Sequence, residues 1–293
     1  MKKEILIPAT RFADPTVDFA FKRIFGTEKY KDATINLLNG LIPELDIRDI
    51  AFLNNEIIGD TLDSKKSVID IRAEDSAGRQ FIIEMQRASQ SHFRERTLYY
   101  ASRVISLMGQ AGCDYIIEPV YVVSLMNFSM EKLNLPLSGG KYMMHYRVSD
   151  TDSGEKMPGG PEFFFFSLPD FKKAEGELLS IQENWIYLLS NSKNFKEIPR
   201  RYRDDPRFRA YFEASSRASF SKAEEDQYTK DMMTQRDIEN SKREACERAR
   251  AEGRAEGAAE KSREMAKKMK DANIGLDVIS ECSGLSIEEI NEL

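Results

Sequence analysis

The stretch KKSVIDIRAEDSAGRQFIIEMQRAS, residues 65–89, decides the fold of this 293-residue chain. Two apolar runs flank a short polar segment, which is the pattern of a β-hairpin. Each run nevertheless carries one acid in its middle, Asp70 in the first and Glu84 in the second. A buried strand favours Val or Ile at such positions. These two acids therefore require a physical reason, and the pairing of the strands supplies one.

A five-residue loop over residues 75–79 sets Glu74 opposite Gln80 and brings Asp70 opposite Glu84. Side chains alternate between the two faces of a strand, and directly opposite Cβ atoms lie about 5 Å apart. One predicted face is entirely apolar and belongs to a core: Ile69, Ile71, Ala73, Phe81, Ile83 and Met85. The other predicted face carries the acids: Val68, Asp70, Arg72, Ile82, Glu84 and Gln86.

Two carboxylates at this spacing repel each other, so one must hold a proton unless a cation lies between them. An ion pair with Arg72 is one explanation, and a divalent metal ion is the other. Mg²⁺ needs few protein ligands, so Asp70, Glu84 and the backbone carbonyl of Met85 suffice. A metal ion there lowers the pKa of its bound water and stabilises charge on a phosphodiester during in-line attack.

The composition indicates a soluble globular protein, with 41% hydrophobic and 31% charged residues and no apolar run long enough for a transmembrane helix. The N-terminal stretch lacks the apolar core of a signal peptide, which predicts a cytoplasmic protein. Cys113, Cys246 and Cys282 are far apart, and only His92 and His145 are histidines. A disulfide framework, a cysteine zinc site and a histidine-rich metal site are therefore not expected. A P-loop, a Rossmann glycine fingerprint, HExxH and GxSxG are also missing from the sequence.

Basic residues gather around the hairpin although the formal net charge of the chain is −6. Net charge alone does not indicate a nucleic-acid binder, but phosphates respond to a local basic face. This segment is either a solvated helix face or a track for phosphates. Its arginines are Arg72, Arg79, Arg87, Arg94, Arg96 and Arg103.

Hydrophobic periodicity predicts helices on both sides of the hairpin. The first covers residues 14–26, with Asp14 as N-cap, Pro15 at N1 and Gly26 at its end, and the second ends before Pro43. A third begins near residue 91, ends at Gly109 or Gly112, and presents Phe93, Tyr100, Val104 and Leu107 on one face. A fourth, over 178–191, has Leu178, Leu179, Trp185, Leu188 and Leu189 as core. Strands are expected within 46–58, 115–128 and 161–169, with a loop or a long hairpin turn over 149–160.

The chain becomes charged and alanine-rich from residue 221 to about 270, where the motif RAEG occurs twice in succession at 250–257. Pairs such as Glu264 and Lys268 support a long exposed helix, which we interpret as a spacer or a dimer contact.

Residues 271–293 predict two short helices, with Ser286 and Glu289 forming a capping box for the second. The pattern resembles a helix-turn-helix, but the second helix also carries Glu288 and Glu292 and has no Lys or Arg. Such a helix repels phosphates, so a small folding or docking unit is favoured over DNA reading.

The acid of the first hairpin strand followed by Glu84-x-Gln86 resembles the PD-(D/E)XK nuclease motif, with Gln86 where lysine is most frequent. Further segments, among them DPTVDFAFKRIFG, RTLYYASRV, EPVYVVSLMNF, FFFFSLPDF and the ARAEGRAEG tail ending in GLSIEEI, extend the resemblance over nearly the whole chain. Together they resemble the bacterial recombination-promoting nuclease and transposase family. The resemblance implies an α/β fold: a restriction-endonuclease-like mixed sheet flanked by helices over residues 1–220, with a long helical C-terminal extension.

The resemblance also implies a Mg²⁺- or Mn²⁺-dependent DNA endonuclease associated with recombination or mobile elements. Asp70 and Glu84 would bind the metal ion, and Gln86 would orient the attacking water or contact the scissile phosphate. A glutamine cannot carry the positive charge that lysine brings to the transition state. The alternative is a catalytically silent DNA-binding or assembly protein that retains the fold.

Several residues are candidates for supporting roles. Asp18 and Lys22 lie one helical turn apart and either serve the site or form an ordinary ion pair. Lys65 or Lys66 either contacts phosphate or is a turn lysine, and Tyr100 is explained as core. The candidates for DNA contacts are Arg94, Arg96, Tyr99 and Arg103, and Arg72 is a further candidate for support.

Overall fold

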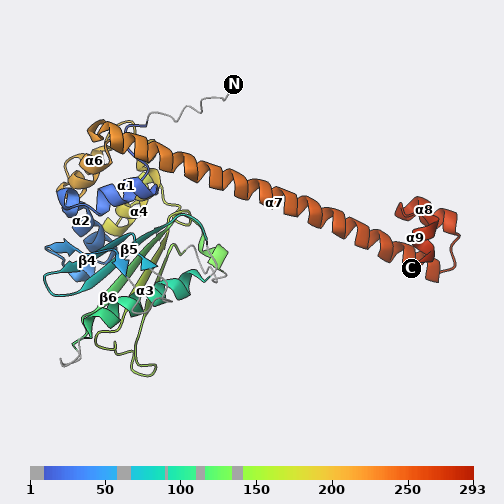
Figure 1. Cartoon of the computed structure of the whole chain (residues 1–293), viewed down its shortest axis with the longest axis horizontal. Coiled ribbons are helices and arrows are strands. Elements are labelled where there is room, and N and C mark those ends of the chain that lie inside the picture. Colours follow the sequence, from blue (N-terminus) through green and yellow to red (C-terminus); the bar gives the residue numbers. More distant parts are fainter. Residues whose placement is uncertain (1–9, 58–66, 90–91, 110–115, 134–140) are drawn as a thin grey trace. The chain divides into compact units, whose positions relative to one another are not determined.

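The computed structural model describes residues 10–57, 67–89, 92–109, 116–133 and 141–293. The chain forms two compact units, Met1–Asp231 and Met232–Leu293. A six-stranded sheet with the order β1-β4-β5-β6-β8-β7 lies at the centre of the first unit (Figure 1). Strands β5, β6 and β8 are parallel to one another and the other neighbours are antiparallel, so the sheet is mixed. Its strands are β1 (Ile50–Phe52), β4 (Ile71–Asp75), β5 (Gln80–Gln86), β6 (Val120–Met126), β7 (Met143–Arg147) and β8 (Glu162–Ser167), and β2 (Glu56–Ile57) pairs separately with β3 (Ser67–Val68).

The β4–β5 hairpin has the predicted register, with Glu74 opposite Gln80. Its loop is fixed by Asp75, whose Oδ1 accepts hydrogen bonds of 3.0 Å from the backbone amides of Ala77 and Arg79. Oδ2 of the same carboxylate lies 2.6 Å from Nε of Arg79. One buried acid thus holds the five-residue loop closed, and the loop length sets the pairing of the strands.

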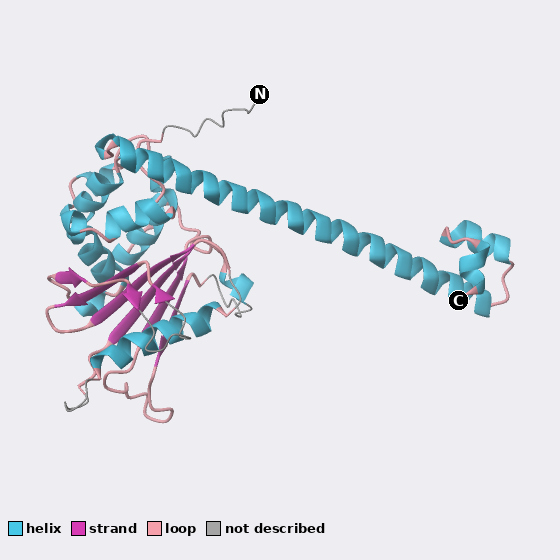
Figure 2. Cartoon of the chain, viewed as in Figure 1, coloured by secondary structure: helices cyan, strands magenta, loops and turns pink. Residues whose placement is uncertain are grey.

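Helices cover both faces of the sheet (Figures 1 and 2). Ile71 of β4 contacts the end of α1, so α1 lies on the Ile71 face. Ile82 of β5 belongs to an apolar cluster with Ala101 and Val104 of α3, so α3 covers the opposite face. The helices of the first face are α1 (Asp18–Phe25), α2 (Lys31–Leu41), α4 (Ile181–Asn191) and α6 (Arg209–Ser215), α3 is Phe93–Met108, and a short α5 spans Arg200–Arg203.

The prediction of a single core face was wrong, because α3 buries the second face as well. Every residue of β5 is buried. The chain bends at Asp70, so Ile69 leaves the predicted alternation and joins the cluster of Ile82. Leu107 and Leu179 were also predicted in the core, but they are 45% and 88% exposed because they lie on the solvent side of α3 and before the start of α4.

Helix α1 begins three residues later than predicted, with Val17 as its N-cap in place of Asp14. The carboxylate of Asp14 is engaged elsewhere. Its Oδ1 accepts a hydrogen bond of 3.0 Å from the amide of Thr16, and its Oδ2 lies 2.7 Å from Nζ of Lys193. Asp14 therefore forms a local turn and an ion pair in place of the predicted helix cap, although Gly26 ends the helix as expected.

Strand β7 was missed by the prediction. It pairs antiparallel with β8, and residues 149–160, predicted as a loop or a long hairpin turn, connect the two strands. All five residues of β7 are partly or fully exposed, so the apolar alternation that identifies buried strands is weak there.

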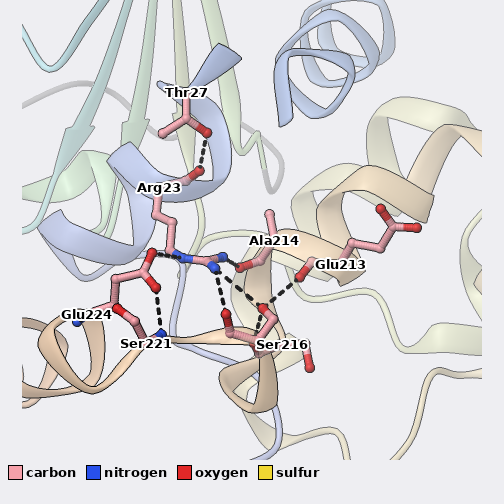
Figure 3. A network of polar contacts seen from close by, with 8 residues as sticks. Arg23, Thr27, Glu213, Ala214, Ser216, Ser221 and Glu224 are labelled. Carbon is pink, nitrogen blue, oxygen red and sulfur yellow. Dashed lines mark hydrogen bonds and ion pairs between the residues drawn. The ribbon is translucent and has the colours of Figure 1, made fainter. Parts of the chain in front are cut away.

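A buried arginine of α1 anchors the first turn of the long helix α7 (Lys222–Asp271) (Figure 3). Arg23 is 7% exposed, and its Nε lies 2.8 Å from Oε1 of Glu224. The guanidinium also donates to the backbone carbonyls of Ala214 and Ser219 and lies 4.3 Å from the ring centre of Phe220. One cation thus joins α1, the end of α6 and the first turn of α7.

The second unit has a small core of its own. Ala266 of α7 packs with Ile279 of α8 (Leu276–Ser283) and Ile290 of α9 (Ile287–Asn291). The capping box of Ser286 and Glu289 is confirmed. Within the described ranges, none of the helices has the length and apolar character that a membrane span needs. The division into residues 1–220, 221–270 and 271–293 stays a prediction.

Candidate active site

The two acids of the hairpin meet where β4 begins and β5 ends. The backbone amide of Asp70 donates to Oε1 of Glu84 at 3.1 Å, and the amide of Met85 donates to Oδ2 of Asp70 at 2.8 Å. Each carboxylate is therefore held by an amide of the other strand. The bend at Asp70 makes this possible, because it frees the amide of that residue from a regular strand ladder.

Burial raises the pKa of Glu84 to about 8, and the nearby charge of Asp70 adds to this rise. Burial also raises the pKa of the Asp70 carboxyl, although the hydrogen bond from the Met85 amide opposes the change. Glu84 is only 4% exposed, so water does little to stabilise its charge. The pair therefore either retains a proton near neutral pH or binds a cation.

A hydrogen-bonded relay supports Glu84 from the α3 side. Nε2 of Gln86 donates to Oε2 of Glu84 at 2.8 Å, and Nη2 of Arg96 donates to Oε1 of Gln86 at 2.6 Å. Both polar atoms of the Gln86 side chain are thus engaged. Arg96, predicted as a DNA contact, is directed into this relay.

Tyr100, which was predicted only as a core residue, also senses the charge of Glu84. It packs against the α3 cluster, and its pKa is raised by burial and by the charge of Glu84. Its hydroxyl therefore lies within electrostatic reach of the acid pair. The spacing of Arg96 and Tyr100 on one face of a helix is the signal that indicates this placement.

Helix α1 supplies charges on the other side of the pair. Nζ of Lys22 lies 3.0 Å from Oδ2 of Asp18, so the predicted ion pair is present. Burial raises the pKa of Asp70, and the hydrogen bond from the Met85 amide lowers it. The charge of Lys22 lowers the same pKa further, and the charge of Asp18 raises it. Asp18 and Lys22 thus form an ion pair and also lie near Asp70.

Other candidates lie elsewhere. Arg72 donates to Oε1 of Gln80 at 3.1 Å, and no ion pair between Arg72 and the acid pair occurs among the described residues. Arg94 and Tyr99 are exposed on α3, and Arg103 on the same helix is partly buried. Lys65 and Lys66 lie outside the described residues.

The donor set fits a hard divalent cation. The described part of the chain has no group of three or more His, Cys, Asp and Glu side chains arranged for a metal ion. A site of two carboxylates with a backbone carbonyl suits Mg²⁺ or Mn²⁺, which keep several waters. Asp70 and Glu84 supply these carboxylates, and Met85 lies between Glu84 and Gln86.

A family model described as a PD-(D/E)XK nuclease family transposase matches residues 15–245. The matched range contains α1, the hairpin, α3, the remaining strands and the first part of α7. No curated protein and no solved structure gives a significant match.

Proposed function

Because this chain belongs to the PD-(D/E)XK nuclease family transposases, we propose that it is a metal-dependent DNA endonuclease centred on Asp70 and Glu84. The observation that carries the proposal is the mutual backbone anchoring of these two acids. Burying two carboxylates side by side is unfavourable, and a fold does not need it for stability. A cation bound between the two carboxylates offsets their repulsion and accounts for their burial side by side.

Asp70, Glu84 and the backbone carbonyl of Met85 are the proposed ligands of Mg²⁺ or Mn²⁺. When bound, such an ion activates a water molecule for attack and neutralises charge that develops on the phosphate. Glu84 must release its proton before it binds the ion, because only the carboxylate is a ligand. The raised pKa of Glu84, caused first by burial, therefore couples metal binding to pH.

Gln86 is proposed to orient the attacking water or to contact the scissile phosphate. Its hydrogen bond to Glu84 also fixes the orientation of that carboxylate. Asp18 is proposed to support the metal centre from α1, and Lys22 to balance its charge.

DNA is the proposed substrate. Arg94, Tyr99 and Arg103 of α3 are proposed to contact it, with Arg96 acting through Gln86. The segments 221–270 and 271–293 are proposed as a helical spacer that permits a homodimer and as a small docking unit. The cytoplasmic location remains a prediction.

One observation favours a second candidate function, a catalytically silent DNA-binding or assembly protein. Gln86 stands where lysine is most frequent in the superfamily, and both polar atoms of its amide form hydrogen bonds within the protein. In this second function, the protein lacks the positively charged lysine of the motif, keeps the fold and its DNA-binding surface, and does not cleave DNA.

A plasmid-nicking assay separates the two functions. Wild type is compared with the Asp70→Asn/Glu84→Gln double variant and with Glu131→Gln, a control at an exposed acid, in Mg²⁺, Mn²⁺ or chelator. If the protein is a nuclease, the plasmid is nicked only in the presence of the metal ion, and only by the wild type and the Glu131→Gln control. Equal nicking by the double variant would assign cleavage to another site or a contaminant, and a lack of nicking in all proteins would favour the silent protein.

A further inference from the structure

Ser124 lies within β6, and its side chain is completely buried. Its Oγ has no hydrogen-bond partner among the described residues. A buried hydroxyl without a partner is unfavourable because it has lost its hydrogen bonds to water, and native proteins contain few such groups. Val122 and Met126, two residues before and after it on the same face, are apolar. Packing alone would therefore favour an apolar residue at position 124 as well.

The register of the sheet places Ser124 directly beside Glu84. The two residues are partners in the parallel pairing of β5 and β6. They lie on the same face, because Ile82 and Val122, two residues before them, belong to one apolar cluster under α3. On its other side Ser124 is paired with Phe165 of β8, whose side chain has no hydrogen-bond acceptor. Glu84 is thus the polar side chain that adjoins this hydroxyl in the sheet.

The carboxylate of Glu84 has capacity for another donor. Its Oε1 accepts from the amide of Asp70, and its Oε2 accepts from Nε2 of Gln86. A carboxylate offers about four acceptor sites, so a metal ion and a further donor can both be accommodated. Because β5 lies between β4 and β6, Asp70 adjoins Glu84 on one side and Ser124 on the other. Neighbouring strands are about 4.8 Å apart, so a change of side-chain rotamer brings the hydroxyl to the carboxylate.

We infer that Ser124 is a positioning residue of the metal centre, and that its hydroxyl donates to the Glu84 carboxylate when this carboxylate holds Mg²⁺ or Mn²⁺. The inference rests on the proposed nuclease function and deepens it. A hydrogen bond to a ligating carboxylate fixes its orientation, and the loss of such a partner typically costs about 10- to 100-fold in metal affinity. In the metal-free protein the same hydroxyl is unsatisfied. Metal binding and stability therefore make opposite demands on position 124.

The test measures stability and metal affinity separately in the full chain. Ser124→Ala removes the hydroxyl, whereas Ser124→Thr keeps it and adds a methyl group. The matched control is Ser167→Ala in β8, because Ser167 is equally buried but its Oγ donates to the backbone carbonyl of Phe128 at 3.0 Å. Melting temperatures are measured in chelator, Mn²⁺ affinities by titration calorimetry at one pH, and plasmid nicking in Mg²⁺.

Ser124→Ala should melt in chelator at or above the wild-type temperature, because an unsatisfied buried hydroxyl is removed. Its Mn²⁺ affinity should nevertheless fall about tenfold. Ser124→Thr should bind Mn²⁺ more tightly than Ser124→Ala, although the additional methyl group in a packed core lowers its melting temperature. Ser167→Ala should show the reverse pattern, a lower melting temperature with the wild-type Mn²⁺ affinity.

Wild-type Mn²⁺ affinity in Ser124→Ala would overturn the inference. A fall in its melting temperature like that of Ser167→Ala would also overturn it, because the hydroxyl would then stabilise the fold. Equal Mn²⁺ affinities of Ser124→Ala and Ser124→Thr would have the same meaning. If wild type binds Mn²⁺ but does not nick DNA, the nuclease proposal fails, and the affinities of the serine variants still decide the inference. A wild type that does not bind Mn²⁺ overturns both.

Discussion

The backbone amide of Asp70 donates a 3.1 Å hydrogen bond to the carboxylate of Glu84 and so holds the two acids together. The amide of Met85 returns a hydrogen bond to Asp70. The arrangement is preorganised for a cation, and in the metal-free protein it is electrostatically unfavourable. Stability and metal binding therefore both depend on the proton that burial retains on Glu84.

The metal-free protein should lose stability as the pH rises from about 4.5 to about 8. Burial keeps Glu84 protonated up to about pH 8 in the folded state, whereas an unfolded glutamic acid titrates near 4.5. The folded state binds the extra proton in this window, so the free energy of unfolding falls by at most about 1.4 kcal/mol per pH unit. Urea unfolding in chelator at several pH values measures the slope.

Glu84→Gln removes this titration and should flatten the slope, whereas Glu131→Gln, at an exposed acid, should retain it. A slope that survives in Glu84→Gln would show that another group titrates, and it would contradict the assignment to Glu84.

Metal affinity should rise with pH and level off above about pH 8. The ion displaces the proton that burial retains on Glu84, so each pH unit below the pKa costs about tenfold in affinity for one released proton. Titration calorimetry with Mn²⁺ at pH 6, 7, 8 and 9 provides the affinities. Asp70→Asn should abolish binding at all four values, and a pH-independent affinity in wild type would contradict proton displacement.

The pairing of the hairpin could be predicted from the sequence because local features determine it. The loop of residues 75–79 has the length that sets the register, and Asp75 and Arg79 close it. This register and the alternation of side chains are enough to predict that the acids at positions 70 and 84 lie opposite each other. The PD-(D/E)XK fold and family followed from these residues together with the wider motif pattern.

The rest depends on contacts between distant segments. The bend at Asp70 and the burial of Ile82 by α3 cannot be read from strand periodicity, since they depend on which helix covers the second face. The inward direction of Arg96 and the influence of Glu84 on the pKa of Tyr100 depend on how α3 docks on the sheet. The alternation of side chains along a single strand does not indicate either of these two placements.

Arg96→Met should shift the pH dependence of Mn²⁺ binding to higher pH. The pKa of Glu84 is raised first by burial and then by Asp70, and the charge of Arg96 opposes this rise. Without that cation Glu84 holds its proton more tightly, so the midpoint of the affinity curve moves up. Arg94→Met, at an exposed position of the same helix, should leave the midpoint unchanged. A downward or absent shift in Arg96→Met would contradict the relay through Gln86.

Arg23→Met should destabilise the first unit by about 3 kcal/mol, because it removes a buried cation that satisfies several acceptors. The backbone carbonyls of Ala214 and Ser219 lose their donor, and Glu224 loses its ion pair (Figure 3). Glu224→Gln should cost about 1 kcal/mol or less, since the side chain of Glu224 is 34% exposed and water replaces part of the pair. Urea unfolding of both variants, with Arg48→Met as the exposed control, gives the comparison. Equal costs for the two variants would show that the ion pair, and not the carbonyl contacts, anchors α7 to the helix that carries Asp18 and Lys22.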